Sequence, residues 1–256
     1  MVLPLKQTIL YGPVNSRRYG KSLGINLMPC RYKLCSFNCV YCHFGWTDKR
    51  TRDVSECAAD LPGFDDVVRE VEQAAKSSLD FGLFTFSGNG EPTLYPRFVE
   101  LVDAVRAIRD RYRPTARVAL LSNSSGLGRD DIRQCMAKID LPVLKLDAGT
   151  AKGFRAINRP APGIGFEATV DHLRSIDDIY IQTVLVDGYP SNTSPDDLAA
   201  YFEKIAQIKP QEVHRYSIDR PVPETRLQLV PPERLREIAA QGERETGVPM
   251  RAFCKN

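Results

Sequence analysis

Residues 82–123 carry the pattern that decides the fold, GLFTFSGNGEPTLYPRFVELVDAVRAIRDRYRPTARVALLSN. Two short apolar segments, 82–88 and 117–123, flank a longer stretch of mixed polarity. In that stretch the apolar side chains recur at spacings of three and four residues, as they do on one face of a helix: Phe98, Leu101, Val102, Val105 and Ile108. A strand, a helix and a second strand in this order are typical of a parallel sheet with helical crossovers.

The same alternation continues along the chain. Four more segments have the apolar or β-branched character of strands: 22–27, 143–148, 179–186 and 212–218. Helical spacing is found in three more: 67–75, 198–208 and 235–239. The second of these helices also has a start signal, because Ser194 can cap it and Pro195 suits its first turn.

Six strand–helix units predict an α/β fold, namely an incomplete (β/α)6 barrel of the TIM type, although a doubly wound sheet has the same signature. The 256 residues contain no repeat and no evident linker. We therefore expect one domain over residues 1–256, with its barrel core at about 20–245 and short extensions at both ends. Ligands bind at the C-terminal ends of the strands in both architectures, so motifs directly after strands matter most.

Composition narrows the class of protein. The apolar content of 43% and the charged content of 26% are those of a soluble globular protein. The N-terminal residues have too short and interrupted an apolar run for a signal peptide, and no later segment has about 18 consecutive apolar residues. We therefore expect a cytoplasmic monomer that does not enter a membrane. Because the cytosol keeps thiols reduced, clustering among the seven cysteines indicates metal rather than disulfides.

The formal net charge is +3, and the basic excess lies early in the chain. Residues 1–60 contain nine Lys or Arg and four Asp or Glu. One interpretation is ordinary solvated surface charge. The other is a basic rim around the cysteines that faces an anionic substrate or an acidic electron donor.

The motif Cys35-Ser-Phe-Asn-Cys39-Val-Tyr-Cys42 places three thiols within eight residues, directly after the first expected strand. Soft thiolates suit zinc or an iron–sulfur cluster. A cube of four irons held by only three cysteines leaves one iron without a protein ligand. The motif thus predicts a metal site with a reactive, open position at Cys35, Cys39 and Cys42.

Three other interpretations of the cysteines stay open at this point. The first is a zinc site with His43 as the fourth ligand, but adjacent residues such as Cys42 and His43 rarely chelate one tetrahedral ion together. Covalent haem would use the match of residues 39–43 to C-x-x-C-H, but such attachment belongs to exported proteins. The cysteines could also be buried apolar residues.

A second motif, Gly88-Asn89-Gly90-Glu91-Pro92, directly follows the second expected strand. Glycines allow a ligand to approach the backbone closely, and a carboxylate can accept hydrogen bonds from an ammonium group. We therefore expect Gly88, Asn89, Gly90 and Glu91 to bind a cofactor.

The spacing C-x3-C-x2-C, with aromatic Tyr41 before the last cysteine, resembles the radical S-adenosylmethionine (SAM) superfamily. The resemblance implies that the cysteines hold a [4Fe-4S] cluster and that SAM chelates the fourth iron. Reductive cleavage of SAM would then release a 5′-deoxyadenosyl radical. It also implies an electron donor of the flavodoxin or ferredoxin type. The motif at residues 88–92 is similar to the cofactor-binding turn G-G-E-P of that superfamily.

Further site residues follow from the resemblance and from strand parity. Ser122 and Asn123, at the end of a strand, match positions where members contact the ribose or carboxylate of SAM. In VLKLDA, alternation puts Lys145 and Asp147 on the face toward the barrel interior, where they either pair with one another or meet ligands. We expect Asp147 and Tyr41 beside the cofactor and Lys145 as a catalytic residue.

Several stretches resemble the wyosine-synthesis-like Fe-S oxidoreductase branch: residues 12–27, 87–94, 145–150, 157–160 and 215–224. Archetypal members of this branch remodel a guanine in tRNA with a two-carbon fragment of pyruvate and use a second cluster. The other cysteines, Cys30, Cys57, Cys135 and Cys254, form no second triplet. We therefore expect no second cluster and do not transfer the archetypal reaction to this chain. The expected substrate is a tRNA base or another anionic molecule, and the alternative is a small molecule or a peptide.

Overall fold

The computed structural model describes residues 2–16 and 18–254. One large sheet has the strand order β1-β2-β5-β6-β7-β8-β9-β11, with β10 paired to β8, and β3 and β4 form a small second sheet. Arg17, one of the early basic residues, lies outside the described part. The strands are β1 Leu10–Ser16, β2 Gly20–Ile25, β3 Leu34–Cys35, β4 Lys49–Arg50, β5 Leu83–Phe86, β6 Arg117–Ser122, β7 Leu141–Lys145, β8 Tyr180–Gly188, β9 Glu212–Ser217, β10 Leu227–Leu229 and β11 Met250–Ala252.

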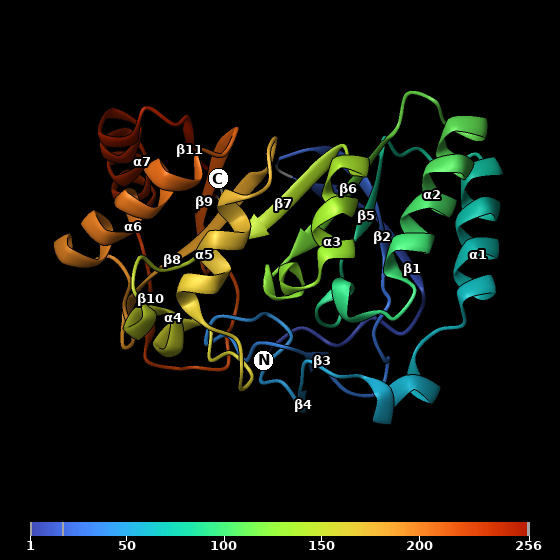
Figure 1. Cartoon of the computed structure of the whole chain (residues 1–256), viewed down its shortest axis with the longest axis horizontal. Coiled ribbons are helices and arrows are strands. Elements are labelled where there is room, and N and C mark those ends of the chain that lie inside the picture. The colour runs from blue at the N-terminus through green and yellow to red at the C-terminus, as the bar shows by residue number, and fades with distance from the viewer. Residues whose placement is uncertain (1, 17, 255–256) are drawn as a thin grey trace.

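The six expected strands correspond to β2, β5, β6, β7, β8 and β9, and each runs parallel to the next. Strands β1 and β11, which the sequence did not predict, extend the sheet at its two ends. Within the described residues these end strands do not pair with one another, so the barrel stays open between them. The prediction of an incomplete barrel is confirmed (Figure 1).

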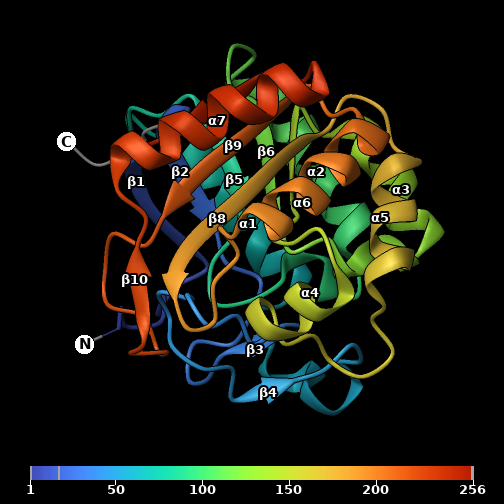
Figure 2. The ribbon, with the colours of Figure 1, turned by 90° about the vertical axis from the view of Figure 1, so that its left-hand side faces the viewer.

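Helices cover the outer face of the curved sheet (Figures 1 and 2). Those expected from the sequence are present and somewhat longer, and the Ser194 hydroxyl accepts a bond from the Asp197 backbone N–H at 3.2 Å, as its expected cap role requires. The α-helices are α1 Phe64–Lys76, α2 Phe98–Tyr112, α3 Asp130–Cys135, α4 Ala151–Ile157, α5 Phe166–Arg174, α6 Pro195–Ile208 and α7 Pro232–Thr246. The described residues also form four short 3₁₀ helices: η1 Ser55–Asp60, η2 Pro92–Leu94, η3 Ser125–Gly128 and η4 Met136–Lys138.

Alternate residues of the strands face opposite sides of the sheet. On β5, Phe84 and Phe86 are fully buried toward the helices, whereas Leu83 and Thr85 line the barrel interior. Near the N-terminal ends of the strands the interior is filled by a small apolar cluster: Leu83, Ala119, Leu141 and Val143. The interior is hollow toward the C-terminal ends.

The segment between β2 and α1, which contains β3 and β4, lies beneath the C-terminal ends of the strands (Figures 1 and 2). It carries the three motif cysteines, so the predicted metal loop is placed where barrels of this kind bind ligands.

Strand β1 is the outer edge of the sheet on one side. Its pairing with β2 shifts register between Tyr11 and Val14, around Gly12 and Pro13, and four of its seven residues are exposed. At the opposite edge, β11 is only three residues long.

Candidate cluster and cofactor site

The cysteine loop is held from two directions. Cys35 ends β3, which pairs with β4. Backbone bonds from Asn38 to the carbonyl of Asn158 (3.0 Å) and from Val40 to the carbonyl of Ile157 (3.0 Å) fasten the loop to the end of α4. These bonds fix the loop before any ligand is added.

The three motif cysteines are free thiols; Cys35 and Cys39 are buried, and Cys42 is partly exposed and lines a cavity. Burial raises the pKa of Cys35 to about 12, against the lowering effect of Lys33. Burial, together with the charge of Asp147, raises the pKa of Cys39 to about 11. Such thiols keep their protons in water, and binding a metal removes them.

Each cysteine sulfur has a different nitrogen group beside it. The Asn123 side-chain amide donates to Cys35 Sγ and the Asn158 amide donates to Cys39 Sγ, both at 3.5 Å. Burial opposes the charged form of Lys33, but the nearby sulfur groups of Cys42, Cys35 and Cys39 outweigh it and raise the pKa of the lysine. An environment rich in N–H donors suits sulfur ligands that carry negative charge.

The glycine turn packs directly on the cysteine loop. A Cβ atom at Gly90 would overlap the carbonyl oxygen of Leu34, the residue before Cys35, and one at Gly88 would overlap the Asn26 side chain. Gly88 also has a φ of +135°, which side chains rarely allow. Both glycines line the same cavity as Cys42, so the expected cofactor turn and the cysteine loop share a wall.

The side chains of Asn89 and Glu91 are turned into the protein. The amide of Asn89 bonds the backbone of Lys6 and Pro29, and it ties the N-terminal segment to the turn. The Glu91 Oε1 atom accepts bonds from Thr93 and from the Ser122 hydroxyl (2.8 Å), and Oε2 accepts one from the backbone N–H of Asn123 (2.6 Å).

The carboxylate of Glu91 thus links β5 to β6 through the ends of both strands. Burial raises its pKa, although these hydrogen bonds favour the charged form. Ser122 and Asn123 also serve this internal network, because their side chains bond Glu91, Ser36, Cys35 and the backbone N–H groups of the two residues that follow Asn123. The cofactor roles of these four residues stay predictions.

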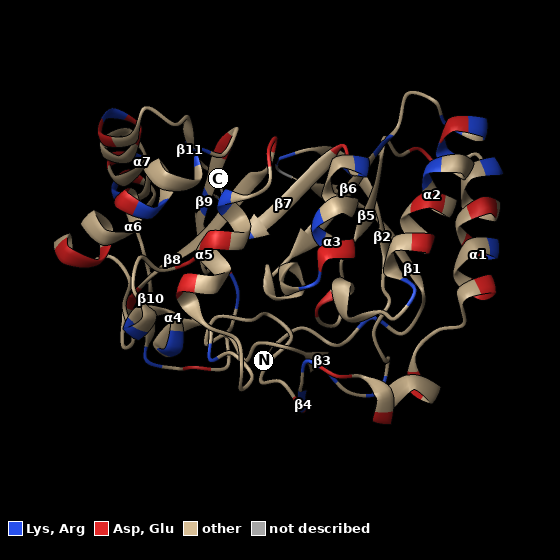
Figure 3. Cartoon of the chain, viewed as in Figure 1, with Lys and Arg blue, Asp and Glu red and all other residues tan. Residues whose placement is uncertain are grey.

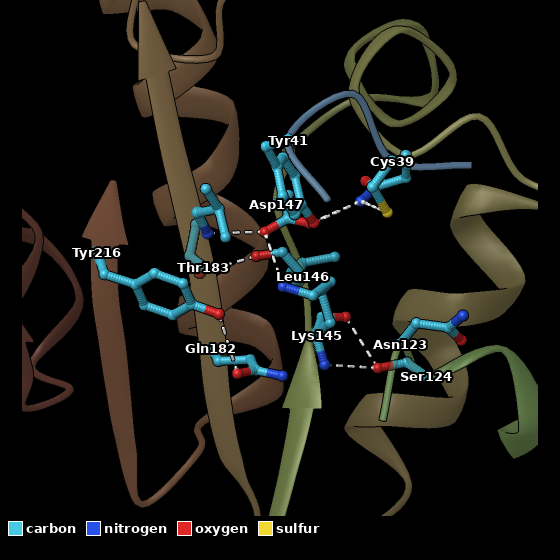
Figure 4. A network of polar contacts seen from close by, with 12 residues as sticks. Cys39, Tyr41, Asn123, Ser124, Lys145, Leu146, Asp147, Gln182, Thr183 and Tyr216 are labelled. Atoms are coloured by element: carbon cyan, nitrogen blue, oxygen red, sulfur yellow. Dashed lines mark hydrogen bonds and ion pairs between the residues drawn. The ribbon is translucent and has the colours of Figure 1, made fainter. Parts of the chain in front are cut away.

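Asp147 lies directly behind the cysteine loop (Figure 4). Its carboxylate accepts bonds from the Tyr41 hydroxyl, from the Asn158 amide (2.6 Å) and from the backbone N–H of Val184 (2.8 Å). Burial and Asp147 together raise the pKa of Tyr41 well above its ordinary value. Asp147 thus fixes the loop to β7 and β8, and its predicted contact with a cofactor stays a prediction.

Lys145 projects into the cavity, as strand parity predicts. Its Nζ atom is buried, makes no hydrogen bond with the described residues, and lies 3.6 Å from Asp147 Oδ1 and 5.2 Å from the centre of the Tyr41 ring. Burial favours the neutral amine, but the negative charge of Asp147 outweighs it and raises the pKa of Lys145. An ammonium with free N–H groups therefore faces the cavity.

Two neighbouring cavities share part of their lining. The cluster chamber, of about 340 Å³, is lined by Cys42, Gly88, Gly90 and Lys145. The deep chamber, of about 290 Å³, reaches toward the opening between β1 and β11. Both parts are lined by a common waist: Tyr11, Arg18, Ser87, Leu121 and Tyr216.

The described lining residues of both chambers include positive side chains and no carboxylate. Arg18 belongs to the waist, Arg220 to the deep chamber and Lys145 to the cluster chamber. The Arg18 guanidinium lies over the rings of Tyr19 and Tyr216, at 5.4 and 5.5 Å from their centres. A cavity of one sign raises the local concentration of anions.

A family comparison decides the class of the protein. The model of the radical SAM superfamily matches residues 31–196, more than half of the chain, and includes both motifs. The chain belongs to the radical SAM superfamily. Radical SAM proteins are enzymes that use a [4Fe-4S] cluster and SAM, so the predicted class and cofactors are confirmed.

Three curated relatives are similar to the chain in sequence. The chain is 30% identical to the UPF0026 protein slr1464 of Synechocystis sp., over 94% of this chain and 82% of that protein. It is 35% identical to the UPF0026 protein MJ1312 of Methanocaldococcus jannaschii and 29% identical to a protein named GTPase Obg of Brachyspira hyodysenteriae. The chain spans 51% of the former and 31% of the latter, so their whole activities do not transfer to it.

Solved radical SAM structures share the fold. A structure of TYW1 with a lysine-pyruvate adduct bound matches with a TM-score of 0.57 at 17% identity, over 87% of this chain and 73% of that one. Streptococcus suis SuiB bound to S-adenosylmethionine matches with a TM-score of 0.64 at 15% identity, over 90% of this chain and 50% of that one.

Over residues 2–16 and 18–254, no three His, Cys, Asp or Glu side chains converge as they would around a single metal ion. A cube of four irons is larger than one ion, so the spacing of the cysteines does not argue against the cluster. In the same described part of the chain, no helix has the length and apolarity needed to cross a membrane.

The expected basic rim is present only in part. Near the cysteine loop, exposed basic residues alternate with exposed acidic ones such as Asp48 and Asp53, and Figure 3 shows both colours along this segment. Lys33 is instead buried beside the cysteines, and Arg18 lines the cavity. Part of the basic charge of residues 1–60 in this radical SAM chain therefore lies inside the protein and not on its surface.

Sequence reasoning missed Lys33, Arg18, Tyr216 and the contact role of Asn158. Asn158 lies 119 residues from Cys39 in the chain, and only a fold can show that they meet. The sequence indicated Asn158 only indirectly, because this residue belongs to the stretch at residues 157–160 that supported the resemblance to the wyosine-synthesis-like branch.

Proposed function

We propose that this chain cleaves SAM reductively at a [4Fe-4S] cluster bound by Cys35, Cys39 and Cys42, and that it directs the resulting radical to an anionic substrate in the deep chamber. The observation that carries this proposal is the shared wall: Cys42, Gly88 and Gly90 line one chamber, and that chamber has five lining residues in common with the deep chamber.

The donor set fits such a cluster. Three thiols in close electrostatic contact have an N–H donor beside each sulfur, and Cys42 is open to the chamber. When bound, the cluster supplies the electron that breaks a carbon–sulfur bond of SAM. The chain's own residues bind and orient the reactants and exclude water.

We assign the cofactor contacts to the backbone at Gly88 and Gly90, because these residues have no side chain between the backbone and the chamber. Glu91 supports the turn from behind, and its Oε2 atom can accept a bond from the ammonium group of SAM. Tyr41, braced by Asp147, forms the wall next to Cys42.

Lys145 and Arg18 are the groups we assign to the substrate. Both carry positive charge on the cavity wall, and the N–H groups of Lys145 are unused. The TYW1 structure named above holds a lysine-pyruvate adduct, which supports a lysine as the contact for a carboxylate or carbonyl group. Because Asp147 holds Lys145 protonated, its first contact with an anionic substrate is an ion pair.

The chamber size favours a small anion as substrate, since about 290 Å³ is at the lower end of ligand pockets. A second candidate is a single base of tRNA turned into the cavity, which the stretches similar to the wyosine-synthesis-like branch support. We also propose that the electron donor is a flavodoxin or ferredoxin and that the chain acts as a cytoplasmic monomer.

Anaerobic reconstitution tests the cluster and SAM cleavage together. The wild-type protein is expected to bind about four irons and, with dithionite, to convert SAM to 5′-deoxyadenosine and methionine. Changing Cys35, Cys39 and Cys42 together to Ala should abolish both results. Changing Cys30, Cys57 and Cys254 together to Ala is the matched control. Iron retained in the first variant and lost in the second would refute the ligand assignment.

A further inference from the structure

Lys33 is a buried lysine next to the loop that contains Cys35, Cys39 and Cys42. It precedes Cys35 by two residues, and only 3% of its surface is exposed. Its ammonium donates to the carbonyl oxygen of Gly45 at 2.7 Å, and the N–H of Gly45 in turn bonds the carbonyl of Cys42 at 3.0 Å. The loop itself therefore holds the positive charge on its inner side.

This ammonium has no carboxylate partner among the described ion pairs. The carboxylate of Asp48, which is near in sequence, accepts a bond from the backbone N–H of Lys33 and not from its ammonium. A buried charge is costly unless another charge or several hydrogen bonds compensate it. The thiolates that Cys35, Cys39 and Cys42 would carry when they bind a cluster would supply that compensation.

Lys33 differs in kind from the other two neighbours of the sulfurs. Asn123 and Asn158 supply neutral N–H groups to Cys35 and Cys39. Neutral donors affect a cluster through short-range hydrogen bonds, whereas a buried full charge acts on the whole cluster through a medium of low dielectric constant. Of these three groups, we expect Lys33 to have the largest electrostatic effect on a bound cluster.

We propose that Lys33 sets the reduction potential of the cluster that Cys35, Cys39 and Cys42 bind, by stabilising its reduced form. Reduction adds one electron from an external reductant and breaks no bond, so the cluster and its thiolates become more negative by one charge. A fixed positive charge beside the sulfurs favours that state and raises the potential. This inference rests on the cluster of the proposed function.

The test is a redox titration of the reconstituted protein, followed by electron paramagnetic resonance without SAM or substrate. Lys33→Met keeps the length and removes the charge, and it is expected to lower the equilibrium constant for reduction at least tenfold, which is about 59 mV for one electron. Lys33→Arg keeps the charge and should stay near the wild-type potential.

Lys49→Met is the matched control. Lys49 is exposed, lies on the strand that pairs with β3, and places its ammonium beside Cys57 and the ring of Tyr32. Removing its charge should leave the potential at the wild-type value.

Each outcome decides for or against the proposal. Lys33→Met with four irons and an unchanged potential overturns it. If Lys33→Met does not hold a cluster, a Lys33→Arg protein with a cluster at near wild-type potential supports the role of charge, and loss of the cluster in both variants overturns it. Failure of the proposed function is separate, because it appears as absent iron in the wild type.

Discussion

At the scale of single residues, Lys145 and Asp147 make the sharpest prediction. Asp147 holds Lys145 protonated, so the wild-type lysine should form an imine with pyruvate only slowly at neutral pH. Asp147→Asn removes a negative charge 3.6 Å from Nζ and lowers the pKa of the lysine. Each pH unit by which that pKa falls increases the neutral amine about tenfold at a fixed pH.

Capture of pyruvate by borohydride, read as intact mass, measures this effect. Asp147→Asn is expected to give faster capture than the wild type, and Lys145→Met is the control that should give none. Equal rates in the wild type and in Asp147→Asn would show that Asp147 does not hold the proton.

Glu91 supports a second residue-scale prediction. Glu91→Ala removes the acceptor of bonds from Thr93, Ser122 and Asn123 and should weaken SAM binding about tenfold or more, since a bond to a charged group contributes about 1.5–3 kcal/mol. Isothermal titration with SAM on the reconstituted protein measures this. Ser122→Ala, which removes only one bond to the carboxylate, should have the smaller effect. An unchanged affinity in Glu91→Ala would remove the turn from the cofactor site.

At the scale of elements, the two ends of β5 make a matched pair. A Cβ at Gly90, after the strand, meets the Leu34 carbonyl, whereas a Cβ at Gly82, before it, meets nothing within 4 Å. Gly90→Ala is therefore expected to push the turn off the cysteine loop and to lose most of the bound iron after reconstitution. Gly82→Ala should keep it. Similar iron in both variants would show that the turn and loop do not need this contact.

The predicted elements were those with a continuous buried pattern. β5 and β7 are buried on both faces and mostly apolar, because helices cover one face and the barrel interior contains the other. Strand β1 was missed because Gly12 and Pro13 interrupt its pattern and most of its residues are exposed. Helix α4 has only two buried residues, Phe154 and Ile157, so its seven residues show no clear period.

For the site, the sequence predicted only those features whose residues are close together in the chain. The cysteines and the Gly88–Glu91 turn are local in sequence, and a motif captures them. The bonds that hold them are not local: Tyr41 meets Asp147 across 106 residues, and Cys35 meets Asn123 across 88. Strand parity did predict the direction of Lys145, because alternation is a property of the strand itself.

At the scale of the whole molecule, His214 joins the two ends of the sheet. From β9 it bonds the hydroxyl of Tyr19, before β2, at 3.0 Å and packs on Phe253, after β11. Burial, with smaller effects of Arg18 and Arg251, lowers the pKa of His214. The unfolded chain therefore binds a proton before the folded protein does as the pH falls.

Stability linked to His214 should be complete above its ordinary pKa of about 6.5 and should decrease as the pH falls below that value, by about 1.4 kcal/mol for each pH unit until the folded protein is protonated too. Urea unfolding of the metal-free protein between pH 5 and pH 8 measures this. His214→Gln should show a weaker dependence over the same range. Equal slopes for both proteins would mean that His214 is not buried as a neutral group.

The two edge strands of the sheet, β1 and β11, affect the tendency of the protein to aggregate in concentrated solution. An open barrel exposes two strand edges, and such edges can recruit strands from other molecules and start aggregation. On one edge, Pro13 offers no N–H group and the shifted register of β1 breaks the regular ladder. On the other edge, β11 offers only three residues. The protein can thus keep its barrel open for a substrate without offering neighbouring molecules a template for growth.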